Sequence, residues 1–400
     1  MMMRDHSMNA VPARTISAIP RIVVLVLTLA LCIVASGQQV LSSQGVSHTI
    51  QRSGDTKPEW TASFPMLTAS PDHWQQAKPA FSYDGKCIAI AGNGEAVVVS
   101  NTGRTLWKWH FGRINRFLVA GSVAVSPTCD AIAMGGDSSY KYVWIADRKG
   151  HAVSVAFKST PFGIVFDRTG QSVAVGTGAG RMFLYHRDGK EVWDTPPYTL
   201  FLPFTMEFSP DNHLLLVRDA AAILRPDGSI VAKFGGGAMS ISRDLQTVVT
   251  SAYPPHGPGP GSVSVSEQSG KFVWNQFSED PGGVITPAGD KIMARVNIDQ
   301  DIPPPDAPYE PRETTLKLFD RVGKELKEFE DIDGRPIDVS PDGMTFLLET
   351  AHSLEAIDIE GKRLYSIPDG VSTYVIASDF SAVVVYSRGS DGDFEYFKLK

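Results

Sequence analysis

The sequence predicts an all-β protein folded as an eight-bladed β-propeller of four-stranded antiparallel blades, on the basis of three observations. A short segment recurs eight times, about every 40 residues, which lies in the range of propeller repeats. Each unit has the pattern of four short strands, and the two ends of the chain together complete one unit. The copies begin at Phe81, Val125, Phe166, Phe208, Ile241, Ile285, Val339 and Ala377.

The third copy shows the four strands of a unit. We expect them at 162–166, 172–176, 182–185 and 191–193. These segments lack an apolar period of 3.6 residues, and the turn before the fourth contains Gly189, which can adopt a positive φ. A single blade cannot bury both of its faces, so neighbouring blades must stack into a ring.

The two ends of the chain are expected to share the last blade. The eighth copy supplies strands at 374–378, 382–387 and 394–399 and then ends one strand short. Residues 58–64 resemble the fourth strands of other copies, such as GRTLWKW and GKEVWDT. We therefore expect this segment to pair with the final strand as a clasp that removes an open sheet edge. Because the fourth unit is short, a seven-bladed ring remains the alternative.

Two short motifs carry a family resemblance. S-P-D-G before the second strand and G-K-x-x-W around the fourth resemble the bacterial and archaeal WD-repeat-like and pyrroloquinoline-quinone-like (quinoprotein-type) propeller repeats. The resemblance covers residues 58–400 and implies the fold, whereas such repeats serve enzymes, scaffolds and sensors alike. Trp107, Trp193 and Trp274 occupy the aromatic position and are expected to pack between blades.

The N-terminal segment has the order of a secretory signal peptide. Arg4, Arg14 and Arg21 precede the apolar run 22–35, and small residues follow it. We expect a signal peptide over 1–37, a flexible lead-in over 38–57 and the propeller domain over 58–400. The chain would then be exported, to the periplasm or outside the cell. An uncleaved anchor, with membrane contact, is the alternative, although the run is short for a span.

Charge and cysteine content restrict the partners. The net charge is −7 and no basic run occurs, which excludes nucleic acid as an expected partner. Cys87 and Cys129 remain after the leader; a disulfide between them is possible, but a small buried thiol is favoured for Cys87.

The sequence favours a non-catalytic protein without a cofactor. Quinoprotein dehydrogenases with similar repeats use adjacent cysteines, and this chain has none. The motifs G-x-S-x-G, H-E-x-x-H and C-x-x-C are also missing. Asn297, Asp299 and Asp301 have a spacing faintly like a calcium loop but lack its Gly and distal Glu, so no metal site is expected.

Two long, proline-rich insertions are the candidate binding surface. They link the second and third strands of the fifth and sixth copies, at 253–261 and 299–311. Alternating strand direction places both on the face that carries the crossings between blades, together with the crossing 196–204. A protein or small-molecule ligand is expected to meet Tyr253, His256, Asp299, Asp301, Tyr309, Tyr198 and Phe201. Tolerated insertions without a role remain the alternative.

These observations predict an exported binding or scaffold module of the cell envelope. The nearest functional analogy is the eight-bladed propeller lipoprotein of outer-membrane assembly, although Leu31 before Cys32 does not fit a lipidation site. The alternative is a hydrolase or lyase with a site in the central channel. Glu207 and Asp338, on innermost strands, are the candidate catalytic acids for that reaction, and solvated channel acids the simpler interpretation.

Overall fold

The structure is a computed structural model of the 400-residue chain. It describes residues 57–63, 79–91, 95–110, 120–136, 141–196, 200, 205–234, 237–253, 260–300, 312–368, 373–377, 380–386 and 393–399. The expected signal peptide and nearly all of the lead-in lie outside these residues. Within the described ranges, no helix has the length and apolar character needed to cross a membrane.

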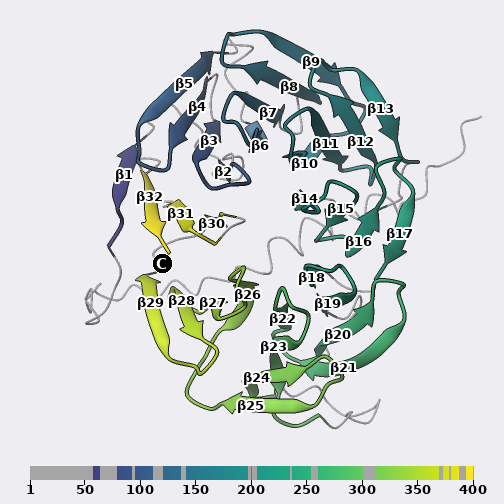
Figure 1. The fold of residues 1–400 in the computed structure, drawn as a ribbon, viewed down its shortest axis with the longest axis vertical. Coiled ribbons are helices and arrows are strands. Elements are labelled where there is room, and N and C mark those ends of the chain that lie inside the picture. Colours follow the sequence, from purple (N-terminus) through teal and green to yellow (C-terminus); the bar gives the residue numbers. More distant parts are fainter. Residues whose placement is uncertain are drawn as a thin grey trace, which may run out of the picture. The chain divides into compact units, whose positions relative to one another are not determined.

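The strands form eight four-stranded antiparallel sheets, which are the blades of a ring (Figure 1). Blade 1 contains β2 (Ala80–Phe81), β3 (Cys87–Ala91), β4 (Glu95–Ser100) and β5 (Thr105–His110). Blade 2 contains β6 (Ala120–Val125), β7 (Ala131–Gly136), β8 (Tyr142–Asp147) and β9 (Ala152–Ala156). Blade 3 contains β10 (Pro161–Phe166), β11 (Ser172–Thr177), β12 (Met182–His186) and β13 (Glu191–Asp194). Blade 4 contains β14 (Met206–Phe208), β15 (Leu215–Val217), β16 (Ala222–Leu224) and β17 (Ile230–Lys233).

The second half of the ring repeats the same order from the centre outward. Blade 5 contains β18 (Ala238–Ile241), β19 (Thr247–Ala252), β20 (Gly261–Glu267) and β21 (Phe272–Ser278). Blade 6 contains β22 (Gly282–Ile285), β23 (Lys291–Asn297), β24 (Thr314–Asp320) and β25 (Glu325–Phe329). Blade 7 contains β26 (Arg335–Val339), β27 (Thr345–Glu349), β28 (Ser353–Asp358) and β29 (Arg363–Pro368). Blade 8 contains β30 (Thr373–Ile376), β31 (Ala382–Tyr386), β32 (Asp393–Lys398) and β1 (Trp60–Ser63).

Blade 8 confirms the predicted clasp and the count of eight blades. Strand β1 pairs antiparallel with β32, with Trp60 opposite Tyr396, and their rings stack with centroids 5.2 Å apart. The Trp60 indole also donates a hydrogen bond to the carbonyl of Asn101 in blade 1. The first strand therefore completes the last blade and touches the first one, as Figure 1 shows at the perimeter.

The hydrophobic core is divided among the junctions between blades. In the described residues, each of the eight junctions has its own cluster of buried apolar side chains. The cluster between blades 1 and 2, for example, contains Val98, Ile132 and Met134, all almost fully buried. Burial of such side chains contributes about 1.5–3 kcal/mol each. The two middle strands of each blade are therefore apolar on both faces, because each face packs against a neighbouring blade.

A buried hydroxyl explains the Ser that recurs in the first turn of five blades, at Ser82, Ser126, Ser209, Ser242 and Ser340. Ser209 is fully buried, its Oγ accepts a hydrogen bond from the Leu214 amide, and it donates to Asp211. The same bonds join Ser242 with Asp244 and Ser340 with Asp342. The hydroxyl donor is the main cause that lowers the pKa of these three aspartates. The turn thus supplies hydrogen-bond partners for the polar groups at the start of the second strand.

The eighth copy is shifted by one residue from its predicted alignment, in which it begins at Ala377 and has Ser378 at the position of the repeated serine. The amide of Ala377 bonds to the carbonyl of Ala382, as the amide of Ser82 bonds to that of Cys87 in blade 1. Ala377, and not Ser378, therefore occupies the position of the buried serine. The alignment was wrong because the serine identity was matched without the turn hydrogen bonds that define the position.

The favoured assignment of Cys87 as a free thiol is also wrong. A disulfide joins Cys87 in β3 to Cys129, with the two Cα atoms 6.1 Å apart. Cys129 lies in the first turn of blade 2, which stacking brings against the second strand of blade 1. It has φ 59°, at the place where the same turn in blade 1 has Gly85. The bridge ties blades 1 and 2 together.

Trp107, Trp193 and Trp274 pack between blades, as predicted, and the last two each cover a hairpin glycine of the next blade. The indole of Trp274 in blade 5 covers Gly323 in blade 6, and a Cβ on this glycine would lie 2.9 Å from the ring. Its Nε1 donates to the carbonyl of Arg321. Trp193 covers Gly228 in the same way. Gly323 has φ +89°, a conformation that other residues rarely adopt.

Two matched substitutions separate the cost of the backbone from the cost of this contact. Gly270 has φ +86° in the equivalent hairpin of blade 5, and no heavy atom lies within 4 Å of the point that a Cβ would occupy. We expect Gly270→Ala to destabilise by about 1 kcal/mol, from φ alone. Gly323→Ala should cost about 1–3 kcal/mol more, because the methyl group displaces the indole. Urea unfolding measures both; equal losses would show that the indole contact contributes nothing.

Candidate functional site

The ring has two faces with different loops. Strand direction alternates within each blade, so first turns and outer hairpins share one face, here called the hairpin face. Links between second and third strands lie with the crossings between blades on the opposite, crossing face. A contact confirms this placement for blade 5: Tyr253, directly after β19, donates from its hydroxyl to Asp280 in the crossing to blade 6, over 3.0 Å.

Tyr253 is half embedded in a charged cluster at the foot of the first long link. The residue is 57% exposed, yet burial of part of its ring and the nearby Asp280 carboxylate raise the pKa of Tyr253. Asp280 also lies 3.8 Å from the guanidinium of Arg295. The hydroxyl is therefore held as a neutral donor to a carboxylate, which fixes the orientation of the ring.

The foot of the second long link lies against the same crossing. The Asn297 side chain accepts a hydrogen bond from the Glu279 amide, and the Gln300 side chain bonds to both backbone polar groups of Phe277. Ile298 between them is 56% exposed. Asp299 accepts a hydrogen bond at its carbonyl from Arg312, whose guanidinium lies 3.7 Å from the Asp299 carboxylate. We call Tyr253, Asp280, Ile298 and Asp299 the blade 5–6 rim.

The remaining predicted binding residues lie outside the described residues. These are His256, Asp301, Tyr309, Tyr198 and Phe201. Of the predicted set, Tyr253 and Asp299 are described, and each belongs to a foot of a long link. Both feet contact the segment that joins blade 5 to blade 6.

The two candidate channel acids are brought together around one arginine. Glu207 in β14 accepts two hydrogen bonds at one oxygen from Arg218, over 3.1 Å and 2.6 Å. The Glu207 carboxylate is the main cause that raises the pKa of Arg218, and Asp338 from β26 adds to it. Burial raises the pKa of Asp338, although Arg218 opposes this. Glu207 is thus engaged as an ion-pair partner, and Asp338 resists ionisation.

Two further arginines reach across the hairpin face near the centre. Arg168, in the first turn of blade 3, donates to the carbonyl of Phe208 in blade 4 and stacks over the Tyr83 ring of blade 1. Burial lowers the pKa of Arg168 to about 10. Arg243 of blade 5 donates weakly to the carbonyl of Pro341 in blade 7. These side chains connect blades that are not neighbours in sequence.

Arg168, Arg218 and Arg243 were not predicted as residues of a site, although the sequence contains a signal for Arg168 and Arg243. The second position of the first turn is proline in four copies, whereas Tyr83, Arg168 and Arg243 depart from it. A search for departures in turns as well as in long links would have found them. Arg218 carries no such mark, because its pairing with Glu207 depends on adjacent strands.

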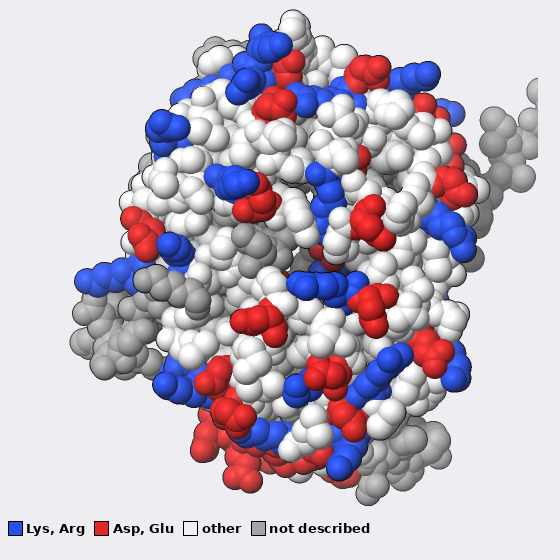
Figure 2. Space-filling model, in the orientation of Figure 1, with Lys and Arg blue, Asp and Glu red and all other residues white. Residues whose placement is uncertain are grey.

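On the face shown in Figure 2, neither sign of charge predominates. Figure 2 shows Lys and Arg interspersed with Asp and Glu over the face in view, around a hollow at the centre of the ring with basic side chains at its border. A mixed surface creates no strong long-range field. This face therefore lacks the basic stripe expected of a nucleic-acid-binding protein.

Comparisons with solved structures identify the fold. A Dos1 propeller is similar with a TM-score of 0.59 at 11% identity, covering 86% of this chain and 95% of that chain. BamB from Moraxella catarrhalis is similar with a TM-score of 0.52 at 14% identity, covering 86% of this chain and 100% of that chain. No protein-family model and no curated protein matches the sequence. At these identities the likeness shows the β-propeller fold alone.

The raised pKa of Asp338 predicts a stability change with pH. A carboxyl that is harder to ionise when folded costs stability at neutral pH, and this cost disappears below about pH 4, where the unfolded group is also protonated. We expect Asp338→Asn to be more stable than the parent at pH 7 and equal to it near pH 3. Asp211→Asn, whose parent carboxyl has a lowered pKa, should show the opposite sign. Thermal unfolding across pH measures both.

Proposed function

We propose that this protein is an exported, non-catalytic binding module of the cell envelope, and that the blade 5–6 rim receives a protein partner. The observation that carries the proposal is the exposure of Tyr253 and Ile298 at the feet of two neighbouring long links. Large apolar side chains that stay exposed while their surroundings are held in place are typical of binding surfaces.

The rim has a fixed framework. Asp280 is bonded by Tyr253, and Asn297 and Gln300 fasten the second link to the end of blade 5. A partner meeting such a surface loses less entropy than one that must order a free loop. The framework therefore supports a preformed contact area.

Exposure of the charges indicates the chemistry of the partner. Beside the rim, Arg295 lies near Asp280 and also pairs at 2.8 Å with Asp333, in the crossing from blade 6 to blade 7. The Asp333 side chain is 76% exposed, whereas that of Arg295 is only 19% exposed. In the pair of Asp299 and Arg312, the carboxylate side chain is likewise more exposed than the arginine side chain. Carboxylates thus face the solvent and guanidiniums lie beneath them. We expect a partner surface with apolar and basic side chains.

The disulfide supports the exported location. Structural disulfides persist in oxidising compartments and are rare in the bacterial cytosol. Cys129 occupies a left-handed position at some conformational cost, which a bridge to Cys87 would offset. This fits the signal-like order of residues 1–37.

The catalytic alternative in the central channel has weaker support. A hydrolase or lyase would need Glu207 or Asp338 as a free acid or base near a reacting atom. Glu207 accepts two hydrogen bonds from Arg218 at one oxygen, so that oxygen is already engaged in an ion pair. We therefore place the function at the rim.

Export is tested by recovering the full-length chain from cell fractions. The periplasmic fraction should contain a protein that begins at residue 38, with Cys87 and Cys129 resistant to alkylation until a reductant is added. Reduction should lower the free energy of unfolding by about 2–4 kcal/mol. Recovery of the intact leader in the membrane fraction would support the anchor, and reactive thiols in the cytosol would contradict export.

Binding is tested with variants of the rim. The mature chain is used as bait on envelope extract, the retained protein is purified, and its Kd is measured directly. We expect Tyr253→Ala/Ile298→Ala to weaken binding at least tenfold, since anchors of this kind contribute about 1–2 kcal/mol each.

The matched control is Phe272→Ala/Val322→Ala, which removes two apolar side chains of similar exposure on blades 5 and 6. It should change the Kd by less than about threefold. Loss of binding in the control but not in the rim variant would place the interface elsewhere. If the parent retains no protein, the binding-module proposal fails.

A further inference from the structure

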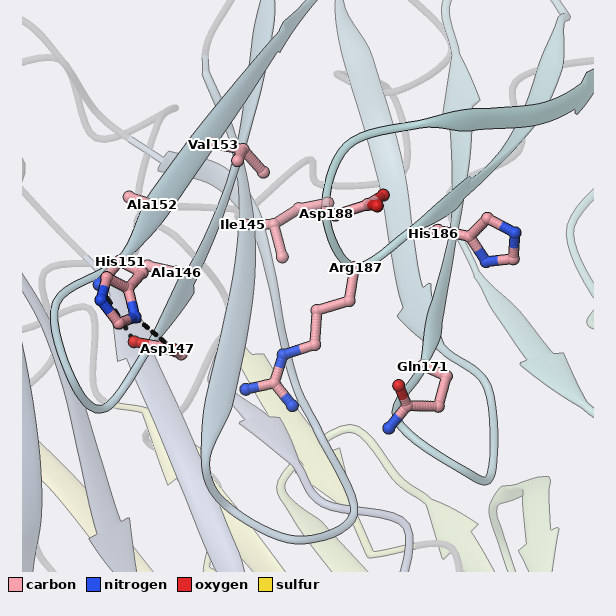
Figure 3. Close-up of a pocket in the computed structure, with 10 residues that line it drawn as sticks. All are labelled: Ile145, Ala146, Asp147, His151, Ala152, Val153, Gln171, His186, Arg187 and Asp188. Atoms are coloured by element: carbon pink, nitrogen blue, oxygen red, sulfur yellow. Dashed lines mark hydrogen bonds and ion pairs between the residues drawn. The ribbon is translucent and has the colours of Figure 1, made fainter.

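A cavity of about 550 Å³ lies between blades 2 and 3 on the hairpin face (Figure 3). Its walls come from the β8–β9 hairpin on one side and the β12–β13 hairpin on the other. The residues that matter below are Ile145, Asp147, Val153, Gln171, Arg187 and Asp188. A volume of this size is in the range of small-molecule sites.

The cavity lies where this junction departs from the repeat. In blades 3 and 5 the fourth strand begins with a bulge, and its Trp covers the next hairpin glycine. Strand β9 pairs with β8 without a bulge and has Ser154 at that place in the sequence. Val153 and Val155 face Gly189 instead of an indole. The smaller side chains leave space beside the hairpin of blade 3.

Arg187 places a prepared cationic group in this space. Its Nη1 donates to both carboxylate oxygens of Asp130, over 3.2 Å and 3.0 Å, and its Nη2 donates to the Asp130 carbonyl. Asp130 belongs to blade 2, so the pair bridges the junction and fixes the guanidinium. Within the part of the chain that the structure describes, Nε of Arg187 has no hydrogen-bond partner. Nη2 has a second N–H, parallel to that of Nε, so this side edge of the guanidinium keeps two parallel donors for a ligand.

The neighbours of Arg187 complete a site for an acid with an apolar body. Figure 3 shows the guanidinium projecting into the cavity, with the Gln171 amide beside it and Ile145 and Val153 above. An amide N–H adds a third donor, and the aliphatic side chains offer an apolar wall.

The two acidic residues that line the cavity, Asp147 and Asp188, are hydrogen-bonded within their own hairpins. Asp147 accepts the amides of Lys149 and His151 and pairs with the His151 ring. Asp188 accepts the amide of Lys190. Their charge still disfavours a doubly charged phosphate beside a single arginine. A singly charged carboxylate matches the open edge of Arg187 in geometry, and it adds less negative charge than a phosphate to a site where Asp130 already balances the arginine.

We propose that this blade 2–3 cavity binds an organic carboxylate, with the carboxylate on the Nε and Nη2 edge of Arg187 and the apolar part against Ile145 and Val153. The ligand is either a free acid or the carboxyl terminus of a peptide, which share this chemistry. The site is on the face opposite to the blade 5–6 rim and does not depend on it.

Calorimetric titration of the mature chain with hexanoate tests the proposal, with hexanamide as the uncharged control. We expect hexanoate to bind with a Kd of about 1 mM and hexanamide at least tenfold more weakly. N-acetyl-alanyl-leucine and its C-terminal amide distinguish the two sources. Tighter binding of the free-acid dipeptide than of hexanoate would identify a peptide terminus, and the reverse order a small acid.

Variants of the cavity complete the test. Arg187→Gln should weaken hexanoate binding at least tenfold. Arg187→Lys should weaken it as much, because an ammonium lacks two parallel donors. Ala152→Trp should block the cavity while leaving the pair between Arg187 and Asp130 intact. Arg225→Gln, in the equivalent hairpin of blade 4, is the control and should change nothing.

The proposal is overturned if hexanoate and hexanamide bind equally, or if hexanoate does not bind at a concentration tenfold above the expected Kd. Unchanged binding in a folded Ala152→Trp variant would also overturn it. Melting temperatures establish that each variant is folded.

Discussion

The pairing of β1 with β32 is the constraint on which the rest of the structure depends. Each blade has two apolar faces, and every junction in the ring has its own buried cluster. A ring with one open junction would expose two such faces and the edge of β32 to water. The stack of Trp60 on Tyr396, and its hydrogen bond to Asn101, hold that junction from both sides. Closure therefore lets all eight clusters, one at each junction, be buried on both sides.

Most of the fold was predictable because its signals are local and repeated. The eight units, the clasp and the inter-blade position of Trp193 and Trp274 follow from turn residues and alternating strands. The alignment of Ala377 failed because the turn is defined by backbone hydrogen bonds and not by a serine. The disulfide to Cys129 was not favoured because its two cysteines meet only when blades stack, and each lies in a different part of its unit.

The candidate sites were predictable only in part, for a similar reason. Long links indicate a departure from the repeat, so the sequence directed attention to Tyr253 and Asp299. It did not indicate Asp280 as the partner of Tyr253, because that contact joins a link to a crossing. Arg218 and Arg187 are unremarkable in sequence and acquire meaning from Glu207 and Asp130 beside them. Ion pairs between strands of one blade, such as Arg218 with Glu207, and between blades, such as Arg187 with Asp130, depend on distances that no local pattern encodes. The two faces therefore carry different chemistry, with acids exposed at the rim and a fixed guanidinium in the cavity.

The clasp also determines when the ring can close during synthesis of the chain. Strand β1 is synthesised first and its partner β32 last, so nearly the whole ring must be made before they can meet. Until then β1 is an unpaired, aromatic-bearing segment, and the incomplete ring presents an open edge that other chains can join. The chain is thus prone to association with other chains until strand β32 has been made and has paired with β1.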